Sequence, residues 1–287
     1  MQARLVLVHS PLVGRGTWGP VARNLAGDGY AVAVPDLAGT VTAGPPYYLR
    51  QARVIAGSAA GEDVILIGHS RAGPLLAAAG TMLGEMVRGY VFVDARLPSP
   101  GSSWMQTVQP GLAARLREMA DPRGWLPPWP QWWGEEELAA LLPDPAAREH
   151  FAAGCPRLPS PGRSWMQTGQ PGMAARLREM ADPRGWLPPW PQWWPEEELA
   201  ALLPDPAARR HFTAECPRLP MAMVEEVQPP APGWPAAPSG YLQLSEAYEG
   251  DAARARELGW PVRRHLSHHL ALLTEPGQVA REIRQLI

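Results

Sequence analysis

The chain has 287 residues, 46% of them hydrophobic, and a net charge of −2. A nearly neutral chain offers no electrostatic attraction to nucleic acid or to an anionic membrane. No apolar run reaches the roughly 18 residues that a membrane span needs, and no charged, apolar leader precedes the first predicted strand. We therefore expect a cytoplasmic protein that binds neither nucleic acid nor membranes.

Short apolar runs alternate with longer amphipathic segments on both sides of residues 97–218. Six runs predict strands: ARLVLVHS, YAVAVPDL, DVILIGHS, RGYVFVDA, SGYLQLS and PVRRHLS. Several are apolar without alternation, which is typical of strands covered on both faces. Between them, residues 17–27, 47–60, 72–86, 249–258 and 276–287 have helical patterns. This order predicts an α/β fold, a mainly parallel six-stranded sheet with helices on both faces.

Residues 97–157 and 158–218 align without a gap at a shift of 61, and only seven pairs differ. Solenoids usually need three or more copies, and their copies diverge. Two nearly identical copies indicate a recent duplication, and 287 − 61 = 226 residues remain as one ordinary domain. The repeat interrupts the strand and helix pattern between the fourth and fifth strands. An insertion there lies at the end of such a sheet where ligands bind.

The stretch VILIGHSRAGPLLAAA is the clearest chemical motif. An apolar strand ends at Ile67, a turn carries Ser70 between the small residues Gly68 and Ala72, and a helix follows. This strand, turn and helix form the context of a nucleophile elbow, which holds a serine on strained backbone in front of a helix N-terminus. A glycine-rich phosphate-binding turn is the alternative, but the G-x-G-x-x-G dinucleotide pattern is absent here. We therefore expect Ser70 to be a nucleophile, with no cofactor and no metal.

With this elbow, the chain resembles the α/β-hydrolase superfamily over nearly its whole length. LVLVHSPLVGRGTW is similar to the first-strand oxyanion segment of compact members that lack the first two strands, and SHHLALLTEPGQVA to their histidine loop. The plant hydroxynitrile lyase and methyl-ester esterase group and small actinomycete hydrolases are the most similar. The resemblance implies a Ser–His–acid triad covered by a cap. It puts the core at residues 1–96 and 219–287, and a duplicated helical, Trp- and Pro-rich cap at 97–218.

The resemblance makes His269 the general base and leaves two acids open. His268 is one residue off register, while His9 and His69 are expected to brace turns. Glu246 holds the more common acid position, after the strand that precedes the histidine strand. Asp94 ends the neighbouring strand, where haloalkane dehalogenases and some lipases carry their acid. We favour Asp94, because an aspartate is the usual partner that fixes the histidine tautomer.

One departure from the family concerns the oxyanion hole. The family's first donor is a backbone N–H at the position that Pro11 occupies here, and proline has none. The backbone of Arg71 is expected to supply the second donor. Leu12 or the hydroxyl of Ser10 could replace the first. Without a replacement, one lost donor costs about 2.7–4 kcal/mol of transition-state stabilisation.

The repeated segment holds five tryptophans per copy, and these are expected either to line an apolar pocket or to form a small core of the cap. The only two cysteines, Cys155 and Cys216, are the same position in the two copies, so neither a disulfide nor a catalytic thiol is expected. The extra apolar surface favours a homodimer formed through the cap. The sequence as a whole predicts acyl transfer on a small or medium apolar ester, thioester or lactone. A lyase, a cyclase or a ligand-binding pseudoenzyme are the alternatives.

Overall fold

The computed structural model describes residues 2–103, 125–126, 158–159, 177–193 and 196–287. The chain divides into two compact units, Met1–Trp104 with Leu177–Ile287, and Met105–Arg176. The boundary between the units does not coincide with the ends of the two repeat copies. The first unit combines the start of copy one with the last part of copy two.

The first unit is built on a six-stranded sheet with the order β10-β9-β4-β3-β1-β2, in which every pair of neighbours is parallel. This confirms the predicted six strands and their direction. Their bounds are β1 (Arg4–Val8), β2 (Val32–Ala33), β3 (Val64–His69), β4 (Val87–Val93), β9 (Ser239–Gln243) and β10 (Val262–Arg264).

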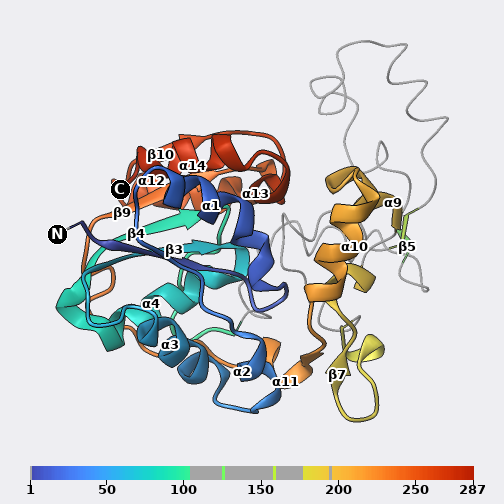
Figure 1. Ribbon diagram of the computed structural model, residues 1–287. Helices are drawn as coiled ribbons and strands as arrows, with labels where there is room; N and C mark the ends of the chain where they lie inside the picture. The colour runs from blue at the N-terminus through green and yellow to red at the C-terminus, as the bar shows by residue number, and fades with distance from the viewer. Residues whose placement is uncertain (1, 104–124, 127–157, 160–176, 194–195) are drawn as a thin grey trace, which may run out of the picture. The chain divides into compact units, whose positions relative to one another are not determined.

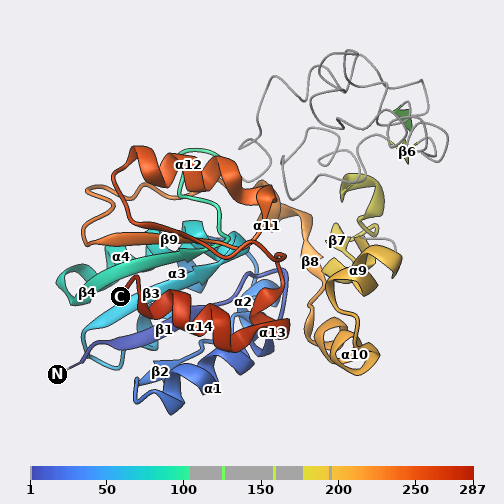
Figure 2. The same cartoon turned by 90° about the horizontal axis from the view of Figure 1, so that it is seen from above.

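Helices cover both faces of the sheet, as the alternating pattern predicts. Figure 1 shows α3 (Tyr47–Gly57) and α4 (Gly73–Leu83) below the sheet, and α1 (Gly19–Gly27) and α14 (Pro276–Arg284) above it. The last two lie side by side in both views (Figures 1 and 2). A further helix, α12 (Glu249–Glu257), is as long as α1 and α14. The shorter elements are η1 (Arg15–Trp18), α2 (Ala38–Thr42), η2 (Ser70–Ala72), η3 (Gly84–Met86), α11 (Met221–Glu225), η7 (Glu246–Tyr248) and α13 (Ala271–Thr274).

The two faces of the sheet have separate cores, because successive side chains of a strand point to opposite sides. On β1, Val6 and Val8 pack with α3, α4 and α12, whereas Leu5 and Leu7 pack with α1, α13 and α14. All four side chains are fully buried. The strands therefore carry apolar residues without alternation, which explains the sequence pattern.

Both copies of the repeat form the same strand pair. In the second unit, β5 (Trp125–Leu126) pairs with β6 (Leu158–Pro159). In the first unit, β7 (Trp186–Leu187) pairs with β8 (Leu219–Pro220) in the same antiparallel register, 61 residues further on. Each copy thus pairs with the first residues of the segment that follows it.

The described part of copy two is mainly helical, with η6 (Trp190–Trp193), α9 (Glu196–Leu202) and α10 (Pro206–Glu215). Asp205 caps α10 by accepting from two backbone N–H groups of its first turn. Trp190 packs edge-on against Phe212, and the Trp193 indole N–H donates to the Pro188 carbonyl at 2.8 Å. These two indoles are buried, so they form a small core within this segment. The tryptophans of copy one lie outside the residues for which side chains are described.

Copy two contacts the sheet domain through the end of α10. The Glu215 side chain lies directly against Gly14 and Gly16, which flank the start of η1. A Cβ at position 14 would come within 2.5 Å of the Glu215 Cβ, and one at position 16 within 2.1 Å of its carboxylate. Copy one has Gly154 where copy two has Glu215, so this contact is specific to the second copy.

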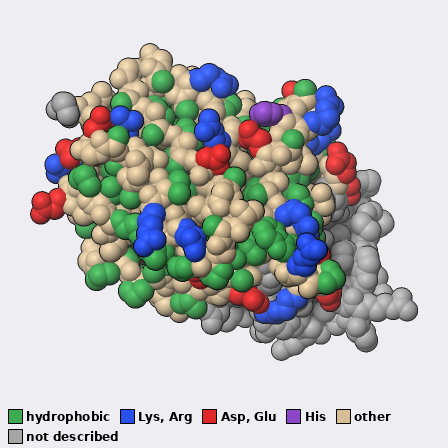
Figure 3. Space-filling model, turned by 60° about the horizontal axis from the view of Figure 1, so that its bottom comes forward, with side chains coloured by type: hydrophobic (Ala, Val, Ile, Leu, Met, Phe, Trp, Pro, Cys, Tyr) green, Lys and Arg blue, Asp and Glu red, His purple; other side chains and the backbone are tan. Residues whose placement is uncertain are grey.

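No helix in the described part of the chain is long and apolar enough to cross a membrane. On the surface that Figure 3 presents, apolar side chains are interspersed with arginines and acids. The exposed large apolar side chains of the described ranges are Leu49, Val54, Met82, Val227, Leu258, Leu266 and Ile287. The predicted homodimer stays a prediction.

Candidate active site

The turn that carries Ser70 is compressed and strained. Ser70 follows β3 with φ +60°, a left-handed conformation that is unfavourable for any residue with a side chain. Neighbouring backbone holds it there, because Ser70 O accepts from Arg96 N at 3.1 Å. A Cβ at Gly73 would lie 1.8 Å from the Arg96 carbonyl oxygen, so only glycine fits behind the turn. Strain held in this way is a common feature of functional sites.

Asp94 stands at the end of the adjacent strand β4, also with positive φ, at +43°. Its carboxylate is fully buried and accepts four hydrogen bonds. Oδ1 accepts from the backbone N–H groups of Leu244 and Ser245 at 2.9 and 3.0 Å. Oδ2 accepts from Ser245 Oγ at 2.7 Å and lies 2.7 Å from His269 Nδ1. The carboxylate is therefore satisfied on both oxygens and fixed in one orientation.

His269 is the partner of Asp94, and its ring is buried among other rings. The His69 ring lies 4.4 Å away, and the Tyr248 ring is nearly parallel at 5.0 Å. His69 Nε2 lies 3.0 Å from the His269 carbonyl oxygen. Burial, and secondly the nearby His269, hold the pKa of His69 well below its ordinary value. His69 therefore stays neutral and donates this hydrogen bond, which braces the histidine loop.

The other expected acid and the neighbouring histidine lie apart from this cluster. Glu246 begins η7, its side chain is 63% exposed, and it lies 3.5 Å from Arg264. His268 Nε2 lies 2.9 Å from Thr274 Oγ1, at the end of α13. Of the two acid candidates, the structure brings Asp94 to His269 and leaves Glu246 at the surface.

The Ser70 hydroxyl has an unforeseen partner. Within the described residues its hydrogen bond is to the Tyr248 hydroxyl, at 3.3 Å, and none to His269 is formed. Unliganded active sites often have long or misaligned catalytic hydrogen bonds that tighten when substrate binds. The sequence did not identify Tyr248 as a site residue, because a single tyrosine in a loop belongs to no motif. Its position five residues after β9, at the carboxyl edge of the sheet, is the one signal that could have suggested it.

The loop after β1 holds Ser10, Pro11 and Leu12, and Pro11 lines the same pocket as Arg71, which follows Ser70. The Leu12 N–H donates to the Ser10 hydroxyl oxygen at 3.2 Å, and the Val13 N–H donates to the Ser10 carbonyl at 3.1 Å. The Leu12 N–H is therefore engaged within its own loop. His9 braces the same loop, since its ring contacts the Ser10 carbonyl and accepts from the Leu37 N–H.

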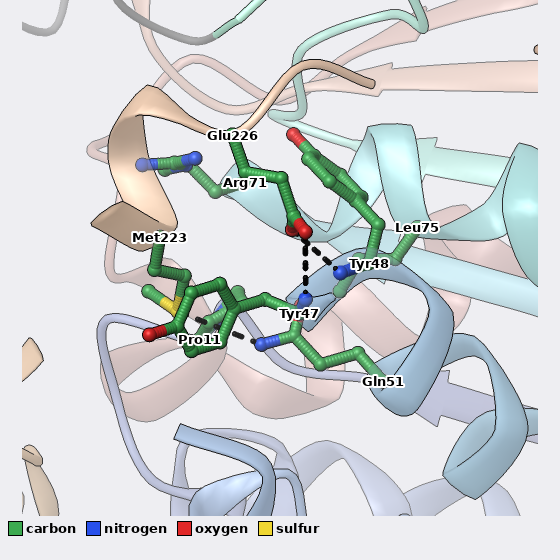
Figure 4. Close-up of a pocket in the computed structure, with 8 residues that line it drawn as sticks. All are labelled: Pro11, Tyr47, Tyr48, Gln51, Arg71, Leu75, Met223 and Glu226. Atoms are coloured by element: carbon green, nitrogen blue, oxygen red, sulfur yellow. Dashed lines mark hydrogen bonds between the residues drawn. The ribbon is translucent and has the colours of Figure 1, made fainter. Parts of the chain in front are cut away.

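A pocket of about 230 Å³, counting its open mouth, lies next to the turn that carries Ser70 and is lined in part by Arg71 (Figure 4). Its walls are the residues Pro11, Tyr47, Tyr48, Gln51, Arg71, Leu75, Met223 and Glu226. Glu226 accepts hydrogen bonds from the backbone N–H groups of Tyr47 and Tyr48, both at 2.8 Å, and so caps α3. Gln51 reaches the Met223 sulfur, which ties α11 to α3. The pocket thus has apolar and aromatic walls with one cation, Arg71.

The environment of Arg71 and of the tyrosines beside it is desolvated. Burial lowers the pKa of the Arg71 guanidinium, and the adjacent Tyr48 hydroxyl partly offsets this. Burial raises the pKa of Tyr48. Polar groups that converge in such a pocket can orient a bound molecule.

Two further chemistries find no support in the described ranges. No group of three or more His, Cys, Asp or Glu side chains gathers there in a way that could hold a metal ion. Cys216 is a free, buried thiol whose pKa is raised to about 12 by burial, so it is not a poised nucleophile. Cys155 lies outside the described residues.

Comparison with known proteins places the fold. No family model and no curated protein matches the chain, but many solved structures do. A polyneuridine aldehyde esterase variant matches with a TM-score of 0.59 at 15% identity, over 99% of both chains. Tomato methylketone synthase I matches with 0.60 at 14%, over 99% of this chain and 97% of the other. A pyrethroid hydrolase from Sphingobium faniae matches with 0.51 at 18%, over 99% and 96%. The chain therefore has the α/β-hydrolase fold.

Proposed function

We propose that this chain is a serine hydrolase that acts by acyl transfer on a small or medium apolar ester, thioester or lactone. The observation that carries the proposal is the Asp94–His269 pair at 2.7 Å, buried beside a serine on a strained elbow. Structures with the same fold bear the names of an esterase, a pyrethroid hydrolase and a synthase, which agrees with carbonyl chemistry at this site.

The mechanism assigns one role to each residue. Ser70 Oγ leaves Tyr248, turns toward His269 Nε2 and attacks the carbonyl carbon while its proton passes to Nε2. Asp94 accepts the Nδ1–H, fixes the tautomer and stabilises the imidazolium. The protonated histidine then gives its proton to the leaving oxygen or sulfur, and water repeats the sequence to release the acid. The N–H of Arg71, directly after the nucleophile, is the expected oxyanion donor.

The pocket supports a small substrate. The 230 Å³ includes space at the open mouth, so the enclosed part is smaller, and a short acyl or alcohol group is the expected occupant. Tyr47, Leu75 and Met223 offer apolar walls to that group.

A non-hydrolytic lyase, a cyclase or a ligand-binding pseudoenzyme is the second candidate, and one observation favours it. The oxyanion hole lacks the donor at Pro11, and the Leu12 N–H is engaged by Ser10. A reaction with less oxyanion character tolerates that loss better than ester hydrolysis does.

The test uses a fluorophosphonate probe and a p-nitrophenyl ester of a short acid. We expect one adduct, at Ser70, and a stoichiometric burst of p-nitrophenol, both abolished in Ser70→Ala. Ser58→Ala, at the C-terminal end of α3, is the control and should keep both. Labelling without ester turnover would favour the lyase or cyclase. Labelling that persists in Ser70→Ala would show that Ser70 is not the nucleophile.

A further inference from the structure

Pro11 cannot supply the first oxyanion donor, and a candidate replacement is Tyr248, which lies far from Pro11 in the sequence. In the loop after β1, the N–H of Leu12 donates to Ser10 Oγ and the N–H of Val13 donates to the Ser10 carbonyl. Both N–H groups are therefore used within the loop. Tyr248, by contrast, brings a hydroxyl to 3.3 Å from Ser70 Oγ. We propose that the Tyr248 hydroxyl donates a hydrogen bond to the oxyanion of the tetrahedral intermediate, in place of the missing N–H. This inference rests on the serine mechanism proposed above.

The position of the hydroxyl fits that role. In the tetrahedral intermediate, the oxyanion and Ser70 Oγ are bonded to the same carbon, so a group within hydrogen-bond reach of one is close to the other. A donor is effective at 2.7–3.1 Å from the oxyanion, a position that a hydroxyl 3.3 Å from Oγ can meet with a small shift. When Ser70 turns to His269, the hydroxyl of Tyr248 becomes free for this new acceptor.

The phenol ring is held rigidly, as a preorganised donor must be. Its ring stacks on His269 at 5.0 Å with an angle of only 5° between the planes. The Arg96 guanidinium carbon lies 5.2 Å from the ring centroid, within cation–π range. Arg96 is itself fixed by Asp251 at 2.9 Å, and Asp251 also accepts from the Leu97 N–H. A chain of contacts from α12 to the histidine ring therefore sets the position of the hydroxyl.

The phenol is also in the right protonation state. Tyr248 is 5% exposed, and burial raises its pKa to about 12. The hydroxyl thus keeps its proton at neutral and mildly alkaline pH and can donate a hydrogen bond to a developing negative charge. A fixed donor in a desolvated site is worth much more than the same group in water.

The step is balanced without any further reactant. The Ser70 Oγ–carbon bond forms, the carbonyl π pair moves to the oxygen, and the serine proton passes to His269 Nε2. Tyr248 keeps its own proton throughout and contributes only the hydrogen bond. On collapse, the bond from carbon to the leaving atom breaks and the proton of His269 follows the leaving group.

Tyr248→Phe tests the proposal, because it removes the hydroxyl and keeps the ring that stacks on His269. We expect kcat to fall about 10²–10³-fold with little change in KM, the loss typical of one oxyanion donor. The same fall should occur with p-nitrophenyl butyrate and with ethyl butyrate, since the oxyanion is common to both. Tyr90→Phe removes a buried hydroxyl from β4, on the α4 side of the sheet, and should keep wild-type rates.

The possible outcomes separate the two proposals. If the fluorophosphonate labels wild-type Ser70 but Tyr248→Phe retains the wild-type kcat, only the role of Tyr248 is overturned. A loss confined to ethyl butyrate would also overturn it, because that pattern assigns the hydroxyl to the leaving group. If wild-type Ser70 is not labelled, the serine mechanism fails and this inference fails with it. Equal losses with both esters, in a variant with an unchanged thermal midpoint, support it.

Discussion

Asp94 accepts four hydrogen bonds although no part of it reaches solvent. Two come from the backbone that follows β9, so the carboxylate joins β4 to the next strand as well as to His269. A buried carboxylate left without such partners is strongly destabilising. The positive φ of Asp94 is tolerable because aspartate enters the left-handed region more easily than most residues. Conformation, burial and hydrogen bonding thus all favour an aspartate at this position.

Asp94→Asn and Glu246→Gln should therefore have unequal effects. An amide at position 94 cannot hold the His269 tautomer in the same way, and we expect kcat to fall by the roughly 10⁴-fold known for this change in serine proteases. Glu246→Gln removes an exposed charge next to Arg264 and should change kcat less than about twofold. Steady-state rates on a p-nitrophenyl ester check both. The reverse ranking would assign the acid to Glu246, and unfolding curves would show whether Asp94→Asn still folds.

His69 gives the site a dependence on pH that concerns stability rather than catalysis. Its ring is buried, donates from Nε2 to the His269 carbonyl and has its pKa held well below the ordinary value. The unfolded chain binds a proton at this histidine near pH 6.5, whereas the folded chain does so only at lower pH. Between these two values the unfolded state carries the extra proton, so stability falls as the pH drops below about 6.5.

We expect the free energy of unfolding to fall between pH 7.5 and pH 5.5, by up to about 1.4 kcal/mol per pH unit for each such histidine below pH 6.5. His9, whose pKa is also lowered by burial, adds to the slope. His69→Gln keeps a side-chain N–H for the His269 carbonyl and should flatten the slope. His211→Gln, at an exposed position on α10, should leave it unchanged. Urea titrations at several pH values measure the slope, and an unaltered slope in His69→Gln would contradict this account.

At the level of elements, the sequence predicts what depends on periodicity and misses what depends on packing. All six strands were predictable, because buried parallel strands are apolar on both faces. The helices α2, α11 and α13 were not, since each spans only four or five residues, too few for a helical pattern. Residues 72–86, predicted as one helix, end as α4 at Leu83 because Gly84 adopts φ +56°.

The same difference between periodicity and packing decides which site residues could be predicted from the sequence. Ser70, Asp94 and His269 could be proposed because the ends of parallel strands meet at one edge of a sheet, where motifs place them. Tyr248 belongs to η7, and its approach to Ser70 depends on how this single turn folds back over His269. No sequence rule gives that geometry. The engagement of the Leu12 N–H by Ser10 is equally a matter of loop conformation.

For the whole molecule, we propose that parts of both copies together make one cap. Leu97 and Ser99, at the start of copy one, donate backbone hydrogen bonds to Asp251 and Gln228 of the core. Residues 177–218, from copy two, complete the same compact unit. Trp104 and Trp165 are equivalent positions in the repeat, so joining Trp104 to residue 166 restores one copy and keeps both junctions.

Deleting residues 105–165 should therefore give a folded 226-residue chain (287 − 61) that retains its activity within about threefold. Every candidate catalytic residue and the contact of Glu215 with Gly14 and Gly16 are kept.

Deleting residues 158–218 instead leaves copy one, where Gly154 replaces Glu215. The thermal midpoint of that variant should be lower than that of the 105–165 deletion, by about 2–4 °C for each kcal/mol of unfolding free energy that is lost. Self-association through the extra copy should weaken in both, as light scattering would measure. An inactive or unfolded 105–165 deletion, beside an active 158–218 deletion, would show that the first copy is the working cap.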